Sequence, residues 1–319
     1  MRPWHPTAGI AFFRPATRAA AQRGQHRPRH ADMTRSPTII RFPFNALLVA
    51  MTIWVVVSGQ TELGHAGELV PRDLSDGETA AVFASSASAY VLGRILAHEV
   101  DLDSALVIPE PPAIDRWFRN HLHGSERPRT NFLDNNFGSA ISPITALVIM
   151  SAIDIDREEF AHDIPMFLAG VVATKGLTDL TKGLVGRTRP CCRAINIDEY
   201  QDPKSHEGHS HSFFSGHASS VFFTSTFLNR RLRRHMRQEW TTDEYRIGRV
   251  LSPIITFSWA TFVGMSRVHA DRHYFTDVAA GALAGAVMGE LFYRLAYESR
   301  DSDGGRSSAP MFMIRIPLP

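Results

Sequence analysis

The chain has 319 residues, of which 44% are apolar and 21% charged, the balance of a folded protein with enough material for a sizeable core. Its formal net charge is only +2, so no broad basic field favours nucleic acid, and any anion must bind at a local site. The two cysteines, Cys191 and Cys192, are neighbours, and a disulfide between adjacent cysteines would close a strained ring. We therefore expect two thiols beside a loop, with neither a disulfide framework nor a redox pair.

The amino-terminal region divides into two segments of different composition. Residues 1–32 are rich in Arg, His, Pro and Ala and show no sustained apolar period, so we expect a non-structured segment upstream of a true start at Met33. Two arginines then precede an uncharged apolar run over 42–58, and a small-x-small sequence ends at Ala66. This layout predicts a secretory signal peptide over 33–66, cleaved after Ala66. The alternative is a retained membrane anchor at 42–58. Both predict an exported protein, periplasmic or extracellular.

Beyond residue 66 the apolar residues recur at helical spacing, so we expect an all-α helical bundle over 67–298 and a carboxyl-terminal tail over 299–319. Strand-like alternation and fixed-period repeats are absent from the sequence. The expected helices cover about 80–100, 113–120, 137–153, 164–186, 216–235, 243–266 and 276–298. The longest uncharged runs are shorter than the roughly 18 to 20 residues of a membrane span. We therefore favour a soluble bundle, with association with a membrane surface as the alternative.

The first polar motif is KGLVGRTRP, residues 182–190. Lys182 and Arg189 stand seven positions apart, so two turns of helix would put both cations on one face. Pro190 and the glycines indicate that the helix ends within the motif. Two such cations can bracket a phosphate, the arginine as a fork and the lysine as a point charge. Taken alone, a solvated basic face explains the motif more simply.

The second motif is Ser215-Gly216-His217, directly before a helical run. A turn at a helix start exposes backbone N–H groups, and the helix dipole favours an anion there. Gly216 permits close approach of that anion to the backbone. His217 would then lie at the rim of a phosphate cradle, in the position of a general acid.

The third motif is SRVHADRHYFTD, residues 266–277. Arg267 supplies another fork for phosphate. His273 and Asp277 stand four positions apart, so on a helix they would be neighbours on one face. The carboxylate would then accept from the imidazole, fix its tautomer and leave the other ring nitrogen as a nucleophile or base. Taken alone, an ordinary pair of helix neighbours is the simpler explanation.

Together, in this order and with these spacings, the motifs resemble the three-part signature of the type 2 phosphatidic acid phosphatase family. Its superfamily also contains bacterial class A acid phosphatases and vanadium-dependent haloperoxidases. The resemblance is close from Lys182 to Asp277 and departs at Phe214, where many members have proline. It implies a helical fold of this kind and hydrolysis of a phosphate ester without a metal or other cofactor.

The resemblance also implies a role for each matching residue. His273 would attack phosphorus and form a phosphohistidine, oriented by Asp277, and His217 would protonate the leaving oxygen. The groups that would hold the phosphoryl oxygens are Lys182, Arg189, Ser215, the Gly216 amide and Arg267.

The other polar residues near the motifs are expected to be secondary. The histidines at 206, 209 and 211 would line the mouth of the site or be solvated. A surface metal at His209 and His211 is a minor alternative, because neither a cysteine nor a carboxylate stands at matching spacing. The residues inside the motifs but off their key positions are His269, Arg187 and Arg272.

The leading hypothesis is a metal-independent phosphohydrolase acting on a lipid phosphate or another phosphomonoester. A vanadium-dependent haloperoxidase is the main alternative, with vanadate held in the same anion site and His273 as its axial ligand. A non-catalytic anion-binding protein is a third. The haloperoxidases are usually much longer chains, which favours the phosphatase. The loops at 118–136 and 193–212, which would surround the site, carry no headgroup motif, and the oligomeric state is not encoded in any motif.

Overall fold

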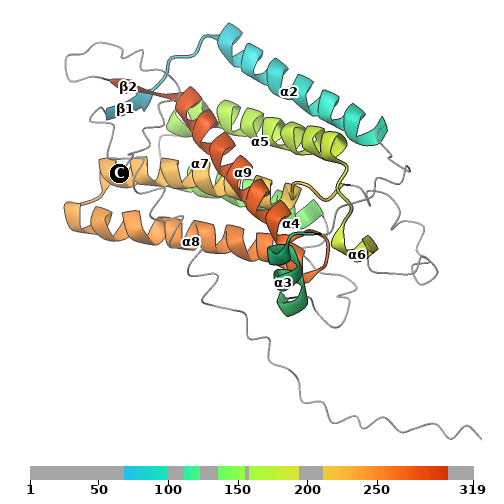
Figure 1. Ribbon diagram of the computed structural model, residues 1–319. Coiled ribbons are helices and arrows are strands. Elements are labelled where there is room, and N and C mark those ends of the chain that lie inside the picture. The colour runs from blue at the N-terminus through green and yellow to red at the C-terminus, as the bar shows by residue number, and fades with distance from the viewer. Residues whose placement is uncertain (1–67, 100–110, 123–135, 155–157, 194–210, 301–319) are drawn as a thin grey trace, which may run out of the picture. The chain divides into compact units, whose positions relative to one another are not determined.

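A computed structural model describes residues 68–99, 111–122, 136–154, 158–193 and 211–300 (Figure 1). Its helices are α2 (Asp76–Glu99), α3 (Ala113–Leu122), α4 (Asn136–Ile153), α5 (Glu158–Val185), α6 (Pro190–Arg193), α7 (Gly216–Glu239), α8 (Thr242–His269) and α9 (Phe275–Ala296). Two short strands, β1 (Glu68–Pro71) and β2 (Tyr297–Arg300), pair antiparallel. The prediction of an all-α fold is confirmed, with this ribbon as an unanticipated addition. Residues 1–32, the expected leader over 33–66 and the tail beyond Arg300 lie outside the described residues.

The helix ends near the polar motifs follow from local sequence signals. Gly186 comes directly after α5 with a φ of 58°, a left-handed conformation that glycine adopts without steric cost. Ser215 caps α7, and its hydroxyl oxygen accepts a hydrogen bond from the amide of Ala218. Because α5 ends at Val185, the prediction that Lys182 and Arg189 share a helix face is wrong. Arg189 lies in the loop that follows.

Helix α9 lies against α7 through three glycines spaced four residues apart, at positions 281, 285 and 289. A Cβ at Gly285 would lie only 2.1 Å from the carbonyl oxygen of Ser219, and a Cβ at Gly281 only 2.5 Å from that of Ser215. Small residues at these positions let the two backbones approach closely. The close approach holds the start of α7 beside the start of α9, so the second and third polar motifs meet.

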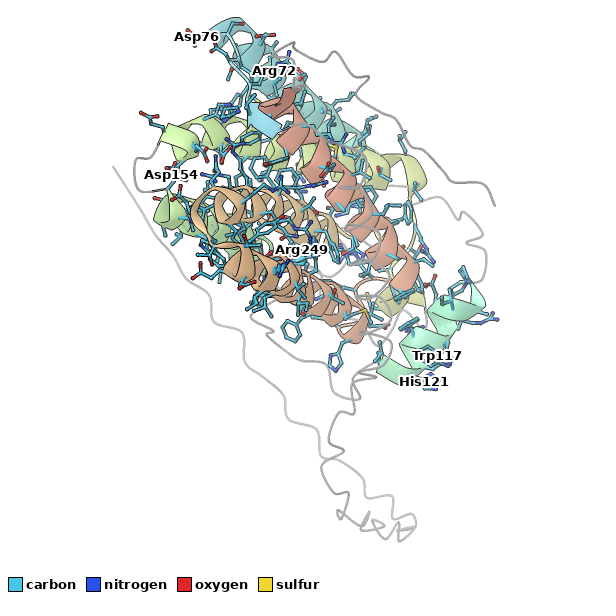
Figure 2. All side chains as sticks on the ribbon, turned by 90° about the vertical axis from the view of Figure 1, so that its left-hand side faces the viewer. Arg72, Asp76, Trp117, His121, Asp154 and Arg249 are labelled. Carbon is cyan, nitrogen blue, oxygen red and sulfur yellow. The ribbon has the colours of Figure 1, made fainter. Side chains whose placement is uncertain are left out.

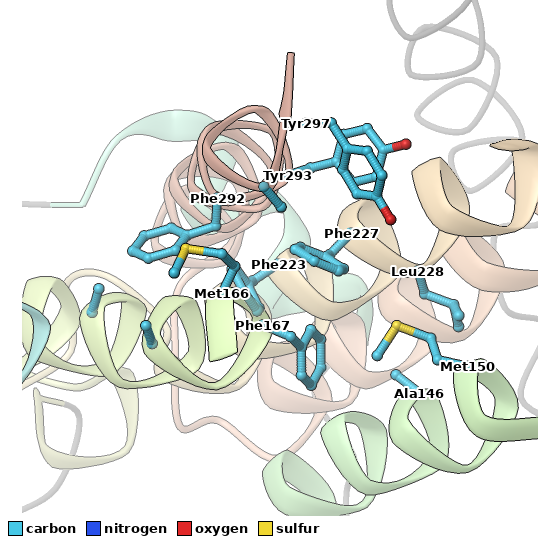
Figure 3. Close-up of a cluster of buried hydrophobic side chains, with 13 residues drawn as sticks. Ala146, Met150, Met166, Phe167, Phe223, Phe227, Leu228, Phe292, Tyr293 and Tyr297 are labelled. Carbon is cyan, nitrogen blue, oxygen red and sulfur yellow. The ribbon is translucent and has the colours of Figure 1, made fainter. Parts of the chain in front are cut away.

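The opposite half of α7 is held by an aromatic core that it shares with α4, α5 and α9 (Figure 3). Phe227 packs edge-on against Phe167 of α5 and Tyr293 of α9, with ring centroids 5.2 and 5.7 Å apart. Phe223, one turn earlier in α7, packs edge-on against Phe292. Edge-to-face pairs of this kind add stability beyond the burial of the rings. The core fixes α7 as the central helix against which the others are placed.

Helix α2 packs with its small residues inward and its large apolar residues outward. Its buried residues are Ser86, Gly93 and Ala97. A Cβ at Gly93 would lie 2.4 Å from the carbonyl oxygen of Gly176, so α2 and α5 are in backbone contact. Val91 and Leu92 face outward and are 55% and 51% exposed. This arrangement is typical of helices whose outer face meets lipid.

Helix α8 has the same character. Ile247 and Ile255 are 61% and 66% exposed, and Trp259 and Phe262 also lie on its outer face. Among the described residues, three helices are long and apolar enough to cross a membrane: α2 over Asp76–Ala97, α8 and α9. These findings indicate membrane association, the alternative to the predicted soluble bundle. The length of uncharged runs alone is a poor guide to a membrane span, because a spanning helix tolerates an isolated charge such as Arg94.

The close contact between α7 and α9 predicts a strong response to one added methyl group. We expect Gly285→Ala to lower the free energy of unfolding by about 1–3 kcal/mol, because backbone atoms of α7 must move to admit the methyl group. Gly77→Ala is the matched control, since a Cβ at Gly77 would meet only the Ser75 hydroxyl, 3.9 Å away. Thermal unfolding in detergent measures both. Equal stability of the two variants would contradict the close approach.

Candidate active site

The three polar motifs meet where α5 ends and where α7 and α9 begin. The amide of Ser215 donates to the carbonyl oxygen of Asp277 at 3.0 Å, which ties the start of α7 to that of α9. The amide of His273 donates to the carbonyl oxygen of Arg267 at 3.3 Å, across the turn from α8 to α9. A Cβ at Gly216 would lie 3.6 Å from Nζ of Lys182. The ammonium group of α5 therefore lies beside the amide-rich start of α7.

Lys182 is half-buried in an unusually cationic setting. Burial lowers the pKa of its ammonium group to about 7, and the nearby cations Lys175 and Arg189 act in the same direction. Cations close enough to lower the pKa of a neighbouring ammonium group create a positive potential that attracts an anion. Lys182 and Arg189 thus place positive charge beside the start of α7, a setting that suits an anion.

His273 is buried and held in one tautomer. Its Nδ1 lies 2.7 Å from the carbonyl oxygen of Ser212, and a carbonyl oxygen only accepts hydrogen bonds, so Nδ1 carries the proton. Nε2 therefore carries the lone pair. The pKa of His273 is lowered to about 4, chiefly by burial and also by Arg189 and Lys182, against the raising effect of Asp277. At neutral pH the ring is thus a neutral imidazole, ready to act as a nucleophile or base.

Asp277 acts on His273 less directly than the sequence predicted. His273 precedes α9, whose N-cap is Tyr274, so His273 and Asp277 are not neighbours on a helix face. The carboxylate lies 3.8 Å from Nδ1 of His273. It accepts hydrogen bonds from the Ser212 hydroxyl at 2.5 Å, from the Tyr274 amide at 2.9 Å and from the guanidinium of Arg187. The carbonyl oxygen of Ser212, and not Asp277 as the spacing predicts, accepts the hydrogen bond from Nδ1 of His273.

Arg187, expected to be secondary, proves central to this arrangement. Its guanidinium binds the carboxylates of Asp277 and Asp115, the latter at 2.8 Å, and lies 4.2 Å from the ring centroid of Tyr274. Its carbonyl oxygen accepts the amide of Ser212 at 2.8 Å. The one sequence feature that points to Arg187 is its place in the first motif, on the loop after the end of α5. Asp115 and Ser212 lie outside the motifs, and no sequence feature points to them.

The remaining predicted residues lie around this centre. Arg267 is buried in the last turn of α8, with Nε 3.3 Å from the hydroxyl of Ser266. His217 is half-buried in the first turn of α7, directly after Gly216. His211 is half-buried beside Ser212.

Two further sequence predictions concern thiols and metals. Cys191 is buried at the start of α6, and its amide donates to the carbonyl oxygen of Asp271 at 3.1 Å. Within the described ranges, no three His, Cys, Asp or Glu side chains gather as metal ligands. The minor metal alternative falls outside this part, since His206 and His209 lie between the described segments.

The low pKa of Lys182 predicts pH-dependent anion binding. Sulfate stays dianionic from pH 6 to 9, and Lys182 is cationic only below a pH of about 7, so the affinity for sulfate should fall by up to about tenfold for each pH unit above 7. Lys182→Arg should abolish that fall, because arginine stays charged. Isothermal titration calorimetry measures both. Lys175→Arg is the control, since Lys175 is paired with Asp179 at 2.5 Å. A sulfate affinity independent of pH in the unmodified protein would contradict the assignment.

Comparison with known proteins agrees with this geometry. Residues 165–301 match the family model of the PAP2 superfamily. Phospholipid phosphatase 1 of Mus musculus is 32% identical over 145 residues, which is 39% of this chain and 48% of that protein. Phospholipid phosphatase 2 of Bos taurus is 28% identical over 146 residues, 40% of this chain and 48% of the relative. The chain thus spans about half the length of these relatives, and no solved structure matches it significantly. Residues 165–301, which contain all three polar motifs, are thus similar to the PAP2 superfamily, and this similarity confirms the predicted resemblance to the type 2 phosphatidic acid phosphatase family.

Proposed function

We propose that the protein is a metal-independent phosphatase that removes phosphate from a lipid phosphate or another phosphomonoester through a phosphohistidine on His273. One observation carries the proposal: the bond from Nδ1 to the Ser212 carbonyl leaves Nε2 of a neutral imidazole free beside two cations. A nucleophile held next to an anion site is the arrangement that covalent phosphoryl transfer requires.

The reaction follows in two displacements. Nε2 of His273 attacks phosphorus, a P–N bond forms, and the bond from phosphorus to the leaving oxygen breaks as His217 gives that oxygen a proton. Water then attacks the phosphohistidine and gives a proton back to His217, the P–N bond breaks, and inorganic phosphate leaves. Lys182, Arg189 and Arg267 would neutralise the charge on the phosphoryl oxygens, which is the principal electrostatic demand of the transition state.

Asp277 contributes through charge. When Nε2 bonds to phosphorus, the imidazole ring becomes cationic, and the carboxylate 3.8 Å from Nδ1 stabilises that charge. The Ser212 carbonyl oxygen continues to accept the hydrogen bond from Nδ1–H and keeps the ring in place. Both groups lie on the side of the ring away from Nε2, so neither competes with the phosphate.

Two findings support a lipid substrate and a membrane location. The relatives compared above are named phospholipid phosphatases, which also favours hydrolysis over the haloperoxidase alternative. The apolar helices α8 and α9 meet the site at their ends, where a membrane-spanning helix reaches the headgroup layer. We propose that the site faces the periplasmic or extracellular side, as the leader pattern over 33–66 indicates.

The direct test measures phosphate release in EDTA from an aryl phosphate and from phosphatidic acid. We expect the unmodified protein to hydrolyse at least one of them, and His273→Ala to lose more than about 10³-fold in kcat, because the nucleophile is gone. His269→Ala is the matched control, since this half-buried histidine lies at the end of α8, outside the catalytic group. Full activity of His273→Ala would contradict the phosphohistidine route, and inactivity of the unmodified protein on both substrates would contradict the phosphatase.

Membrane insertion has its own test on the outer face of α8. Ile255 lies at the middle of the helix and Ile247 near its start. An arginine at the centre of a spanning helix costs about 2.5–3.5 kcal/mol in insertion, and near the headgroups it costs much less. We therefore expect Ile255→Arg to lower the amount of protein that resists carbonate extraction from membranes, and Ile247→Arg to leave it nearly unchanged. Indistinguishable amounts for both variants and the unmodified protein would show that α8 does not cross the bilayer.

A further inference from the structure

Helix α3 contributes a buried carboxylate to the candidate active site from outside the three polar motifs. Asp115 is only 1% exposed. Its side chain accepts from the Arg187 guanidinium at 2.8 Å, from the Thr276 amide at 2.8 Å and from the Thr276 hydroxyl at 2.7 Å. A buried carboxylate with three such partners is firmly fixed, and so are the groups that it binds.

The partners of Asp115 lead directly to the nucleophile. The guanidinium of Arg187 binds Asp115 with one terminal nitrogen and both Thr276, at 2.8 Å, and Asp277 with the other. The backbone of Arg187 holds the amide of Ser212. Ser212 in turn holds Asp277 through its hydroxyl and His273 through its carbonyl. Arg187 therefore holds in place both Asp277, through its guanidinium, and Ser212, through its backbone carbonyl.

From this geometry we infer that Asp115 is a positioning residue for the phosphatase reaction, acting through Arg187 on Asp277, Ser212 and thereby His273. The inference rests on the proposed function. With its carboxylate in place, Arg187 is held between two anions. Without that charge, Arg187 shifts toward Asp277, and the ring loses the orientation that directs Nε2 at phosphorus. A displacement of about 1 Å at such a site can cost about 10²-fold in rate.

A second set of contacts anchors α3 near the start of α9 and allows the positioning role of Asp115 to be distinguished from simple docking of α3. The guanidinium of Arg119 binds both oxygens of Asp271 at 2.8 Å, in the loop directly before α9. Phe118 stacks on Phe275 with ring centroids 3.8 Å apart. Trp117, also on α3, stacks on His121 with ring centroids 4.4 Å apart and packs edge-on against Phe118 (Figure 2). The Arg119 pair anchors α3 through Asp271 and shares no side chain with the hydrogen bonds that join Asp115, Arg187 and Ser212.

The test compares Asp115→Asn with Arg119→Gln, each of which removes one anchor of α3. On an aryl phosphate, we expect Asp115→Asn to lower kcat at least about tenfold, with KM and the inhibition constant of inorganic phosphate within about threefold of the unmodified protein. We expect Arg119→Gln to change kcat by less than about threefold. Thr276→Val, which removes the hydroxyl that bridges Asp115 and Arg187, should lower kcat in the same direction and serves as the second variant if Asp115→Asn does not fold.

Equal losses of kcat in Asp115→Asn and Arg119→Gln would show that Asp115 only docks α3, and would overturn the inference. Unchanged kcat in both Asp115→Asn and Thr276→Val would overturn it as well. It would also be overturned if Asp115→Asn raised the inhibition constant of inorganic phosphate enough to account for its loss of activity. These results differ from failure of the proposed function, in which the unmodified protein itself would release no phosphate.

Discussion

The hydrogen bond from Nδ1 of His273 to the carbonyl oxygen of Ser212 is the constraint on which the chemistry depends. A backbone carbonyl can only accept a hydrogen bond, so Nδ1 must carry the hydrogen. The lone pair of the neutral ring is therefore on Nε2. Ser212 belongs to the segment before α7, and His273 to the turn before α9. The bond can exist only if the two helices begin side by side, so the packing of the helices and the reactivity of the histidine are one problem.

Glycines at the helix contacts make this close approach possible. Gly281 and Gly285 let α9 approach the backbone of α7, and Gly176 and Gly183 do the same for α5 against α2. When small residues occupy the contacts, large apolar residues are left for the outer surface, where α2 and α8 carry them. In water such a surface would be unfavourable, and in lipid it is not. The same choice of residues thus brings the site together and suits the fold to a membrane.

Much of this arrangement could be predicted from the sequence, and the limits are physical. Helical spacing located the helices to within a few residues at most ends, and the three motifs brought Lys182, Gly216 and His273 to one place. Spacing alone wrongly predicted that Lys182 and Arg189, and His273 and Asp277, are neighbours on a helix face. Helix α5 ends before Gly186, and α9 begins only at Phe275. Asp115 was out of reach, because it stands 72 positions before Arg187 in an ordinary amphipathic helix, and only tertiary packing unites them.

The most direct measurement is chemical identification of the phosphorylated atom. Rapid quenching during turnover of a ³²P-labelled phosphomonoester, followed by peptide mapping under alkaline conditions, reports where the phosphoryl group resides. Phosphoramidates of histidine survive base and break down in acid, so the linkage identifies itself. Phosphate on Nε2 of His273 is the predicted result, since Nδ1 is engaged with Ser212. Phosphate on Nδ1, on another residue, or no phosphoenzyme at all in a protein that turns over its substrate would contradict the account.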